Sequence, residues 1–238
     1  MELQNKVAII TGASGGIGEA VARDLDAAGM KLVVTARSQD KLERLVSSLK
    51  NAKAVPGEIT DPELPQKLVD TAIQAFGQLD VVFSNAGVMT VGSIEEVDIE
   101  KICDMVRINV ESVYRMAYTA LRYFKQTGSG FLINTSSISG LKTVANIGAY
   151  CGTKFAIEAF TDALRMELAG TGIGVACIEP GTVDTGLYHN WDDKNKDFVF
   201  SGGALQPEDI ARCVRFILEQ PAHVRIPRLL AVPANQPV

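Results

Sequence analysis

The most constraining feature of this sequence is a regular alternation of short apolar runs with longer segments of helical periodicity. The apolar runs, rich in β-branched residues, lie at 6–11, 32–36, 79–84, 130–135 and 175–179. The longer segments, with apolar residues three and four positions apart, lie at 16–28, 39–49, 62–76, 99–125, 150–169 and 207–218. Continuously apolar strands need cover on both faces. The alternation therefore predicts an α/β fold, a doubly wound parallel sheet with crossover helices on both faces.

The length of the chain sets the domain organisation. At 238 residues and 47% hydrophobic, it can bury one large core, and we expect a single domain over 1–238 with a Rossmann-like architecture. Such a sheet binds ligands beyond the carboxyl ends of its strands. The polar stretch 184–204 contains four aromatic residues, Tyr188, Trp191, Phe198 and Phe200. We interpret it as a lid over that crevice, with an ordinary surface connection as the alternative.

Charge and composition exclude several classes of function. The net charge is -5 and no run of Lys or Arg forms a basic stripe, which argues against a nucleic-acid partner. No apolar stretch approaches the roughly 20 residues that span a bilayer, and the first residues lack the pattern of a signal peptide. We therefore expect a cytoplasmic protein with no membrane partner. Four scattered cysteines and two histidines predict reduced thiols and no metal site.

A glycine-rich turn follows the first apolar run and leads directly into a helical segment. The turn reads Thr-Gly-Ala-Ser-Gly-Gly-Ile-Gly over residues 11–18. Glycines let the backbone approach a pyrophosphate closely, and the N–H groups at the start of a helix attract the anion. The turn predicts a dinucleotide site, although any tight strand-to-helix connection can use glycine.

The end of the second strand bears on which dinucleotide is preferred. A Rossmann site that prefers NAD usually places a carboxylate there to bind the adenosine ribose, but this chain has Ala36 followed by Arg37. A guanidinium can form charge-assisted hydrogen bonds to a 2′-phosphate. Arg37 therefore favours NADP(H) over NAD(H), and its alternative role is a solvated charge at the start of a helix.

Two further groups could provide proton chemistry. Tyr150 and Lys154 are four residues apart in a helical segment, so their side chains share one face. An adjacent ammonium favours the phenolate and can bring a phenol towards the operating pH. Ser137 follows the strand at 130–135, where a hydroxyl can reach a ligand or simply cap a turn. Each feature alone is weak evidence, and the combination carries the argument.

In combination these motifs resemble the short-chain dehydrogenase/reductase family, over nearly the whole chain. The matching elements, in family order, are the glycine turn with Gly12, Gly16 and Gly18, the run Asn85-Ala86-Gly87, Asn109 in a long helix, Ser137 thirteen residues before Tyr150, the Tyr-x-x-x-Lys pair, and Pro180-Gly181 followed by Thr185. The resemblance implies an oxidoreductase that passes a hydride between NADP(H) and a carbonyl or alcohol carbon.

The resemblance also implies a role for each catalytic candidate. Tyr150 is expected to act as general acid or base, and Ser137 to hydrogen-bond the same substrate oxygen. Lys154 is expected to bind the nicotinamide ribose and to depress the pKa of Tyr150. Asn109 is expected to hold a water that connects Lys154 to solvent, or else to be a polar helix residue bonded to neighbouring backbone.

A larger set of residues is expected to bind the cofactor. Its members are Gly12, Ser14, Gly16, Ile17, Gly18, Arg37, Glu58, Ile59, Asn85, Ala86, Gly87, Tyr150, Lys154, Pro180, Gly181, Val183 and Thr185. Two positions depart from the family pattern. Glu58 stands where many relatives have aspartate against the adenine, and Gly15 stands where many NADP-using relatives have a basic residue. NADP selectivity thus rests mainly on Arg37, with help from Ser14 and Ser38, and NAD(H) use stays open.

The substrate is less constrained than the chemistry. The closing segment 223–233 is similar to that of relatives that oxidise serine and 3-hydroxy acids or reduce small carbonyl compounds. The segment 184–204 contains no arginine that could pair with a substrate carboxylate. We therefore expect the substrate to be a neutral carbonyl compound or a secondary alcohol. The resemblance further implies a homodimer or homotetramer, with the segments 99–125 and 150–169 packed between subunits.

Two rival functions belong to other classes. A nucleotide-binding sensor without turnover needs the glycine turn but not Ser137, Tyr150, Lys154 and Asn109 together. A sugar-nucleotide epimerase or dehydratase usually has a longer chain and differently spaced glycines. Nicotinamide absorbance during incubation with alcohols, aldehydes and ketones discriminates between these readings and a reductase.

Overall fold

The computed structural model describes residues 1–188, 191, 196 and 199–237, and within them one parallel sheet forms the centre of the molecule. Its seven strands run in the order β3-β2-β1-β4-β5-β6-β7, all parallel. The strands are β1 (Val7–Thr11), β2 (Lys31–Thr35), β3 (Ala52–Ala54), β4 (Val81–Ser84), β5 (Gly130–Thr135), β6 (Ile173–Pro180) and β7 (Arg228–Ala231).

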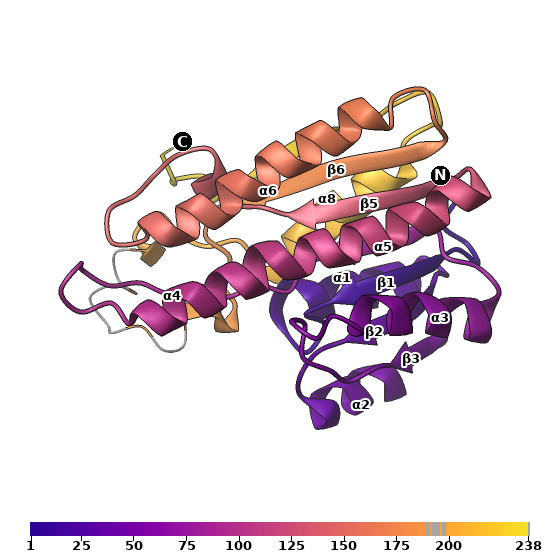
Figure 1. The fold of residues 1–238 in the computed structure, drawn as a ribbon, viewed down its shortest axis with the longest axis horizontal. Helices are drawn as coiled ribbons and strands as arrows, with labels where there is room; N and C mark the ends of the chain where they lie inside the picture. The colour runs from indigo at the N-terminus through magenta and orange to yellow at the C-terminus, as the bar shows by residue number, and fades with distance from the viewer. Residues whose placement is uncertain (189–190, 192–195, 197–198, 238) are drawn as a thin grey trace.

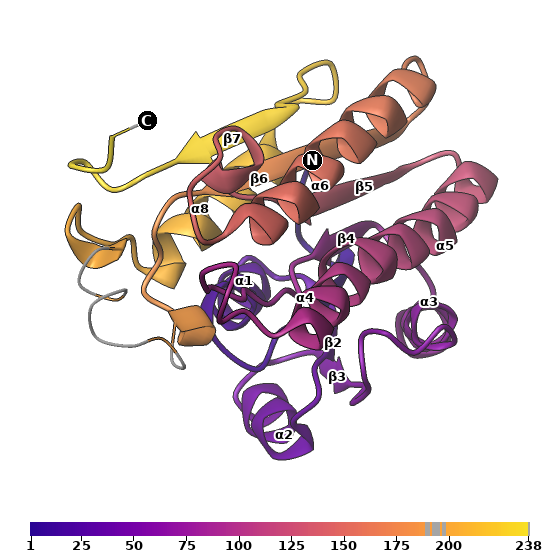
Figure 2. The same ribbon diagram turned by 60° about the vertical axis from the view of Figure 1, so that its left-hand side comes forward.

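Helices connect these strands and cover both faces of the sheet (Figures 1 and 2). They are α1 (Gly16–Ala27), α2 (Gln39–Ser47), α3 (Leu64–Phe76), α4 (Ile99–Val106), α5 (Ser112–Thr127), α6 (Gly148–Glu167) and α8 (Pro207–Glu219), with short helical turns at Ile138–Gly140 and Gly186–Tyr188. None of the helices in the described ranges is both long and apolar enough to cross a bilayer.

The strands are apolar on both sides because each face packs against its own layer of helices. In β1, Ala8 and Ile10 belong to the core shared with α1 and α8, whereas Val7 and Ile9 face the core shared with α3 and α5. All four side chains are completely buried. Removing a buried methylene from either layer costs about 1 kcal/mol. This two-sided burial confirms the fold class that the apolar runs predict.

Two strands and one helical irregularity were absent from the sequence prediction. The strands β3 and β7 lie at the two edges of the sheet, where side chains are partly or largely exposed, so they lack a continuous apolar run. The predicted helix over 99–125 is interrupted by a π-helical segment, Arg107–Glu111, between α4 and α5. The predicted helix at 150–169 begins two residues earlier, at Gly148, which places Tyr150 in its first turn.

The sheet reverses its winding direction at β1, which has β2 on one side and β4 on the other. The connections after β1 and β4 therefore leave towards opposite faces and open a crevice at the carboxyl ends of the strands. Most of the residues that line a large cavity at this edge belong to segments that follow β1, β2, β4, β5 and β6. The fold thus brings the chemically interesting parts of the sequence to one edge of the sheet.

Candidate active site

The cavity at this edge has a volume of about 1150 Å³ and extends across the sheet from the end of β2 to the end of β6. At the β2 end it is lined by Arg37 and Lys41, which we call the adenosine end. At the β5 and β6 end it is lined by Ser137, Tyr150 and Lys154, which we call the reacting end. Cavities of several hundred to a thousand Å³ accommodate small-molecule ligands and cofactors.

The glycine turn between β1 and α1 lines the part of the cavity that lies between these two ends. Gly12 has a φ of +68°, and a Cβ there would lie 2.9 Å from Ala86 Cα. Gly16 also has a positive φ, +55°, and a Cβ on Gly18 would overlap the Gly12 carbonyl. Side chains are consequently disfavoured at Gly12, Gly16 and Gly18, and the N-terminus of α1 faces the cavity with free backbone N–H groups. Its residues fit a pyrophosphate.

Hydrogen bonds between Thr11 and the segment that begins at Asn85 join this turn to the end of β4. The Thr11 hydroxyl accepts hydrogen bonds from the backbone N–H groups of Asn85 (2.9 Å) and Ala86 (3.0 Å), and Asn85 Nδ2 donates to the Thr11 carbonyl (3.2 Å). Asn85, Ala86 and Gly87 all line the cavity. The segment therefore has a structural role as well as the cofactor-binding role predicted for it.

The adenosine end holds two exposed cations, and the sequence analysis named only one of them. Arg37 lies two residues after the end of β2, and Lys41 lies four residues further on, in α2. Both line the cavity, together with Glu58 and Ile59 from the segment after β3. The four-residue spacing of Arg37 and Lys41 was visible in the sequence and could have identified Lys41. Two cations here fit an additional phosphate on the adenosine ribose.

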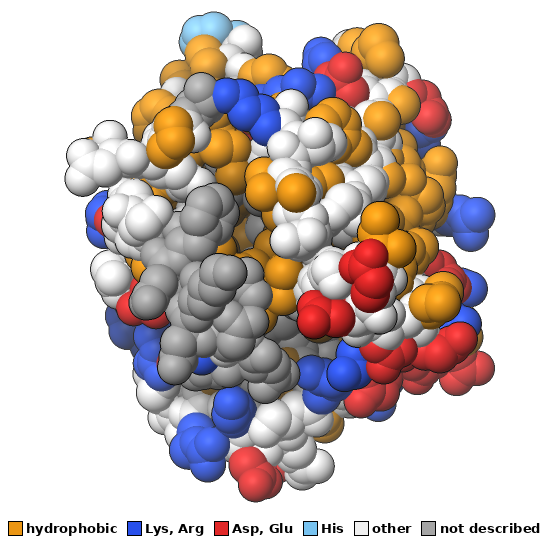
Figure 3. All heavy atoms as spheres, turned by 90° about the vertical axis from the view of Figure 1, so that its left-hand side faces the viewer, with side chains coloured by type: hydrophobic (Ala, Val, Ile, Leu, Met, Phe, Trp, Pro, Cys, Tyr) orange, Lys and Arg blue, Asp and Glu red, His pale blue; other side chains and the backbone are white. Residues whose placement is uncertain are grey.

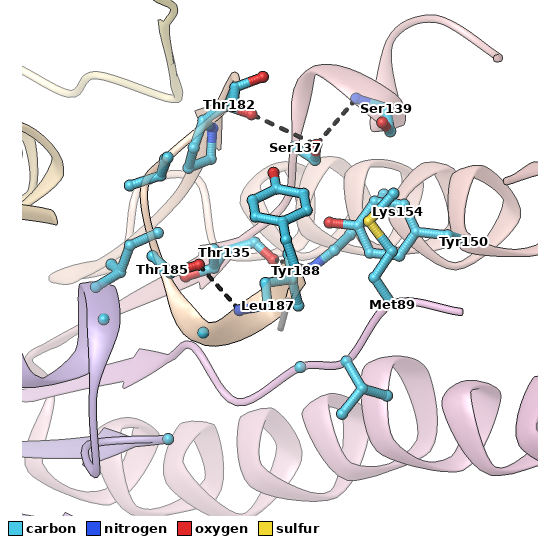
Figure 4. A pocket seen from close by; sticks show the side chains of 18 of the residues that line it. Met89, Thr135, Ser137, Ser139, Tyr150, Lys154, Thr182, Thr185, Leu187 and Tyr188 are labelled. Atoms are coloured by element: carbon cyan, nitrogen blue, oxygen red, sulfur yellow. Dashed lines mark hydrogen bonds between the residues drawn. The ribbon is translucent and has the colours of Figure 1, made fainter. Parts of the chain in front are cut away.

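The reacting end brings together the three groups expected to act in proton chemistry (Figure 4). The Ser137 hydroxyl accepts from Ser139 N–H (3.1 Å) and lies 3.4 Å from the Pro180 carbonyl, to which it donates. Lys154 Nζ donates to the Thr135 carbonyl (2.9 Å) and lies 5.6 Å from the centre of the Tyr150 ring. Tyr150 and Lys154 are 7% and 5% exposed. A phenol, a hydroxyl and an ammonium thus share one buried space.

Burial dominates the proton affinities of these groups. It raises the pKa of Tyr150 above the usual range, an effect that the neighbouring Ser137 hydroxyl partly offsets, and it lowers the pKa of Lys154 to about 8. The sequence analysis expected Lys154 to depress the pKa of Tyr150. In the structure burial is the largest influence on the phenol and raises its pKa on balance, while the ammonium is bonded to the Thr135 carbonyl and lies over the ring. Tyr150 is therefore a neutral phenol at neutral pH.

Asn109 stands behind the cavity and does not line it. Its Oδ1 accepts from Val88 N–H (2.9 Å), and its Nδ2 donates to the Val88 carbonyl (2.8 Å) and to Thr153 Oγ1 (3.2 Å). The residue is 1% exposed and lies in the π-helical segment. Of the two roles expected for Asn109, holding a water or bonding to neighbouring backbone, its side chain shows the second arrangement. Asn109 thereby fixes the segment after β4 against α6.

A buried acidic pair, which the sequence analysis missed, lies beyond Lys154. Glu158 follows Lys154 by one turn of α6, and Glu179 precedes Pro180 in β6. Arg228 of β7 is nearby, with Nε 3.5 Å from Glu158 Oε2 and 4.0 Å from Glu179 Oε1. Burial and the neighbouring Glu158 raise the pKa of Glu179 to about 7. Within the described residues, no cluster of His, Cys, Asp or Glu is arranged to hold a metal ion.

The mouth of the cavity is bordered by aromatic residues of the predicted lid and by the C-terminal tail. The Tyr188 ring packs against Trp191 (5.1 Å between centroids) and Phe200 (5.3 Å), whereas the fourth predicted residue, Phe198, lies outside the described residues. Figure 3 shows the end of the molecule where α4 and the C-terminus lie, with hydrophobic side chains exposed across it. The tail lines the cavity through Asn235, Gln236 and Pro237, which the sequence analysis did not predict.

Of the seventeen positions predicted to bind a cofactor, all except Gly18 line this cavity. Gly18 instead allows α1 to pack closely against Gly12. The glycine turn, the N-terminus of α1 and the two cations together fit a dinucleotide that carries an extra phosphate. These positions come from six separate segments, one after each of β1 to β6, and the topology of the sheet is what assembles them.

Comparison with known proteins identifies a family. The family model for short chain dehydrogenase matches residues 6–196. An uncharacterized oxidoreductase of Staphylococcus aureus is 36% identical over 235 residues, which is 97% of this chain and 98% of the relative. The likeness extends from the first strand to the last.

Solved structures give the same result. The closed form of serine dehydrogenase complexed with NADP+ has a TM-score of 0.91 at 26% identity, covering 98% of this chain and 96% of the other. An alcohol dehydrogenase from Thermococcus sibiricus complexed with 5-hydroxy-NADP has a TM-score of 0.87 at 31% identity, covering 99% of each chain. A 3-ketoacyl-(acyl-carrier-protein) reductase from Brucella melitensis complexed with NADH has a TM-score of 0.89 at 29% identity, covering 98% and 99%.

Proposed function

The chain belongs to the short-chain dehydrogenase family, and on that premise we propose that it transfers a hydride between NADP(H) and a neutral carbonyl compound or secondary alcohol. One observation carries the proposal. One buried end of the cavity contains the hydroxyls of Ser137 and Tyr150 and the ammonium of Lys154. The rest of the same cavity is lined by the glycine turn and by two cations. A nucleotide sensor would need only the glycine turn. A non-catalytic role explains none of the three buried polar groups.

The chain's own residues supply proton transfer and orientation. A bound nicotinamide supplies hydride chemistry at its C4 atom. In the direction of reduction, Tyr150 donates its phenolic proton to the carbonyl oxygen as that oxygen gains negative charge. Ser137 donates a hydrogen bond to the same oxygen and stabilises the charge in the transition state. Tyr150 is protonated at neutral pH, so the proton is available for this step.

Lys154 has two tasks in this proposal. Its ammonium, fixed by the Thr135 carbonyl, can donate hydrogen bonds to the hydroxyls of the nicotinamide ribose. Its charge also favours the phenolate that remains on Tyr150 after proton donation. Because burial lowers the pKa of Lys154 to about 8, the charged form decreases above that pH, and we expect the rate of reduction to decrease with it.

The preference for NADP(H) rests on Arg37 and Lys41, which can pair with a 2′-phosphate. Two of the similar structures hold NADP-type ligands, and one holds NADH. We therefore propose a preference for NADP(H), with NAD(H) as a poorer partner.

The substrate side of the cavity favours a neutral molecule. Among the described residues that line the cavity, the charged ones are Arg37, Lys41, Glu58 and Lys154, and the first three lie at the adenosine end. Apolar side chains such as Met89, Ile147 and Leu187 also line the cavity, together with neutral polar side chains such as Asn146 and Gln236. Within the described part of the chain, a carboxylate substrate would find no lining cation besides Lys154 at the reacting end. A serine or 3-hydroxy acid dehydrogenase is the second candidate, because serine dehydrogenase is among the similar structures.

We also propose that the protein assembles as a homodimer or homotetramer through α4, α5 and α6. Large apolar side chains are exposed along these helices, including Ile99 (71%), Tyr118 (50%) and Met166 (64%). Exposed apolar surface of this kind is typical of interfaces between subunits.

The test is turnover with a panel of neutral ketones, aldehydes, secondary alcohols, serine and 3-hydroxy acids. The absorbance of reduced nicotinamide is followed with NADPH and NADH in parallel arms, and Tyr150→Phe serves as the inactive control. We expect turnover of at least one neutral substrate, faster with NADPH. Binding of NADPH without any turnover would contradict the enzymatic proposal and favour a sensor, whereas turnover of serine or 3-hydroxy acids alone would favour the second candidate.

A further inference from the structure

We propose that Gln236, near the C-terminus, is a positioning residue of the active site, and that it fixes the segment 180–183 beside Ser137. The inference rests on the proposed function, because that segment is the one expected to hold the nicotinamide end of the cofactor. It goes further by assigning a role to residues 232–237, which we call the tail.

Thr182 is the point where three parts of the chain meet. Its backbone N–H donates to Gln236 Oε1 (2.9 Å), and its hydroxyl donates to the Val199 carbonyl in the lid (3.3 Å). Its carbonyl accepts from Leu205 N–H (2.9 Å). Thr182 is 6% exposed, so each of these polar groups needs a partner inside the protein. Gln236 provides the partner of the backbone N–H.

The tail also occupies the space beside Gly181. Gly181 N–H donates to the Ala231 carbonyl (2.7 Å), which extends the pairing of β6 with β7. A Cβ at Gly181 would overlap Gln236 Oε1 and would lie 3.0 Å from Val232 Cγ1. The segment 180–183 is therefore held from outside by the tail, and glycine at 181 permits this close approach.

On its other side the same segment contacts the expected catalytic machinery. Ser137 Oγ donates to the Pro180 carbonyl at 3.4 Å, two residues before Thr182. A shift of the segment would move this carbonyl and change where the Ser137 hydroxyl points. Gln236 thus acts on the reacting end through Thr182 and Pro180.

The orientation of the Gln236 side chain follows from the chemistry of this contact. A backbone N–H can only donate, so the carbonyl oxygen of the amide must face Thr182. The Gln236 side chain is half-buried and lines the cavity together with Asn235 and Pro237. A turn, with Gln236 N–H donating to the Pro233 carbonyl at 3.0 Å, holds the residue in place. An acceptor is therefore the property that the position requires.

This requirement can be tested with two variants of similar size. Gln236→Met removes the acceptor, whereas Gln236→Glu keeps one. Gln74→Met, the same change on the exposed face of α3, is the matched control. For each protein we would measure kcat and KM with a substrate found in the panel, the Kd of NADPH by its fluorescence, and the Kd of 2′,5′-ADP, which resembles only the adenosine half of the cofactor.

We expect Gln236→Met to weaken NADPH binding and to lower kcat, each by about three- to tenfold, because one buried backbone hydrogen bond is lost and the reacting groups are misaligned. The Kd of 2′,5′-ADP should not change, since the adenosine end is remote from the tail. Gln236→Glu should recover most of the loss, and Gln74→Met should match the wild type. The melting temperature of each variant separates local effects from unfolding.

Several results would overturn the inference. Wild-type kcat and NADPH affinity in Gln236→Met would show that the acceptor is dispensable. An equal loss of 2′,5′-ADP and NADPH affinity, or failure of Gln236→Glu to recover activity, would indicate a general structural defect. If the wild-type protein itself binds NADPH but turns over no substrate, the proposed function fails, while the NADPH and 2′,5′-ADP affinities still decide whether Gln236 positions the segment.

Discussion

The two ends of the cavity are built on different principles. The adenosine end is formed largely by backbone groups of the glycine turn and by exposed cations, Arg37 and Lys41. The reacting end consists of buried side chains, with Tyr150, Lys154 and Ser137 each no more than 8% exposed. Exposed cations keep their charge at little cost and are screened by salt, whereas buried groups have strongly altered pKa values. In the proposed function, one end selects the cofactor and the other performs the chemistry.

The largest expected effect comes from the reacting end. Tyr150→Phe removes the proton donor while keeping the ring, and we expect kcat to decrease by about a thousandfold or more. The Kd of NADPH should change little, because the phenol oxygen is not required at the adenosine end. Stopped-flow measurement of hydride transfer, alongside NADPH fluorescence, checks both statements. Activity within tenfold of the wild type would show that another group donates the proton.

The next effect belongs to the adenosine end. Arg37→Asp replaces a charge-assisted partner of the 2′-phosphate with a repulsive one, and kcat/KM for NADPH should decrease by about a hundredfold. Its kcat/KM for NADH should stay the same or increase. Lys41→Ala should produce a smaller loss, restricted to NADPH and reduced at high salt. Equal losses with both cofactors would contradict a role in selecting the 2′-phosphate.

A third effect concerns the stability of the protein and comes from the buried acidic pair next to the reacting end. Because the folded-state pKa of Glu179 is raised to about 7, the folded protein binds more protons than the unfolded chain between about pH 4.5 and pH 7. Stability contributed by this group is therefore present at low pH and is lost as pH rises through 7. Glu179→Gln stays neutral, so its stability should decrease less between about pH 5 and pH 8, by about 2 kcal/mol.

Thermal unfolding of both proteins across that pH range measures this difference. Arg37→Asp, which changes only the exposed adenosine end, should follow the wild-type pH dependence and is the control. An identical pH dependence in Glu179→Gln and the wild type would show that the acidic pair does not titrate in this range.

The smallest expected effect is a gain at the adenosine end. Gly15 has an extended backbone with φ of 167°, and a Cβ there would meet no atom within 4 Å. Gly15→Arg should therefore fold normally and place a third cation beside the cavity, tightening NADPH binding by about threefold. Gly15→Ala is the control for the loss of glycine. Titration of both variants with NADPH and NADH would reveal any gain, and tighter binding of both cofactors equally would argue against a contact with the 2′-phosphate.

The same contrast explains which features were predictable from the sequence. The glycine turn and the pair Tyr150 and Lys154 are local patterns, so their spacing alone placed them on one turn or one helix face. The parallel sheet was predictable because its central strands are apolar on both faces. These central features determine the fold class.

Features that depend on distant parts of the chain were not predictable. The edge strands β3 and β7 lack a continuous apolar run, and Glu158 and Glu179 come together only through the packing of α6 on β6. The contact of Gln236 with Thr182 joins residues 54 positions apart. No residue spacing in the sequence indicates such a contact. The burial of Tyr150, which raises its pKa, can likewise be judged only in the folded chain.

The most direct test of the account is a crystal structure of the protein with NADP+. We predict that the nicotinamide ring lies at the reacting end, with its ribose hydroxyls within hydrogen-bond distance of Lys154 Nζ and its C4 atom facing the space between Ser137 and Tyr150. The 2′-phosphate should lie against Arg37 and Lys41. A cofactor bound in the opposite direction, or with its nicotinamide away from Tyr150, would contradict the assignment of the two ends.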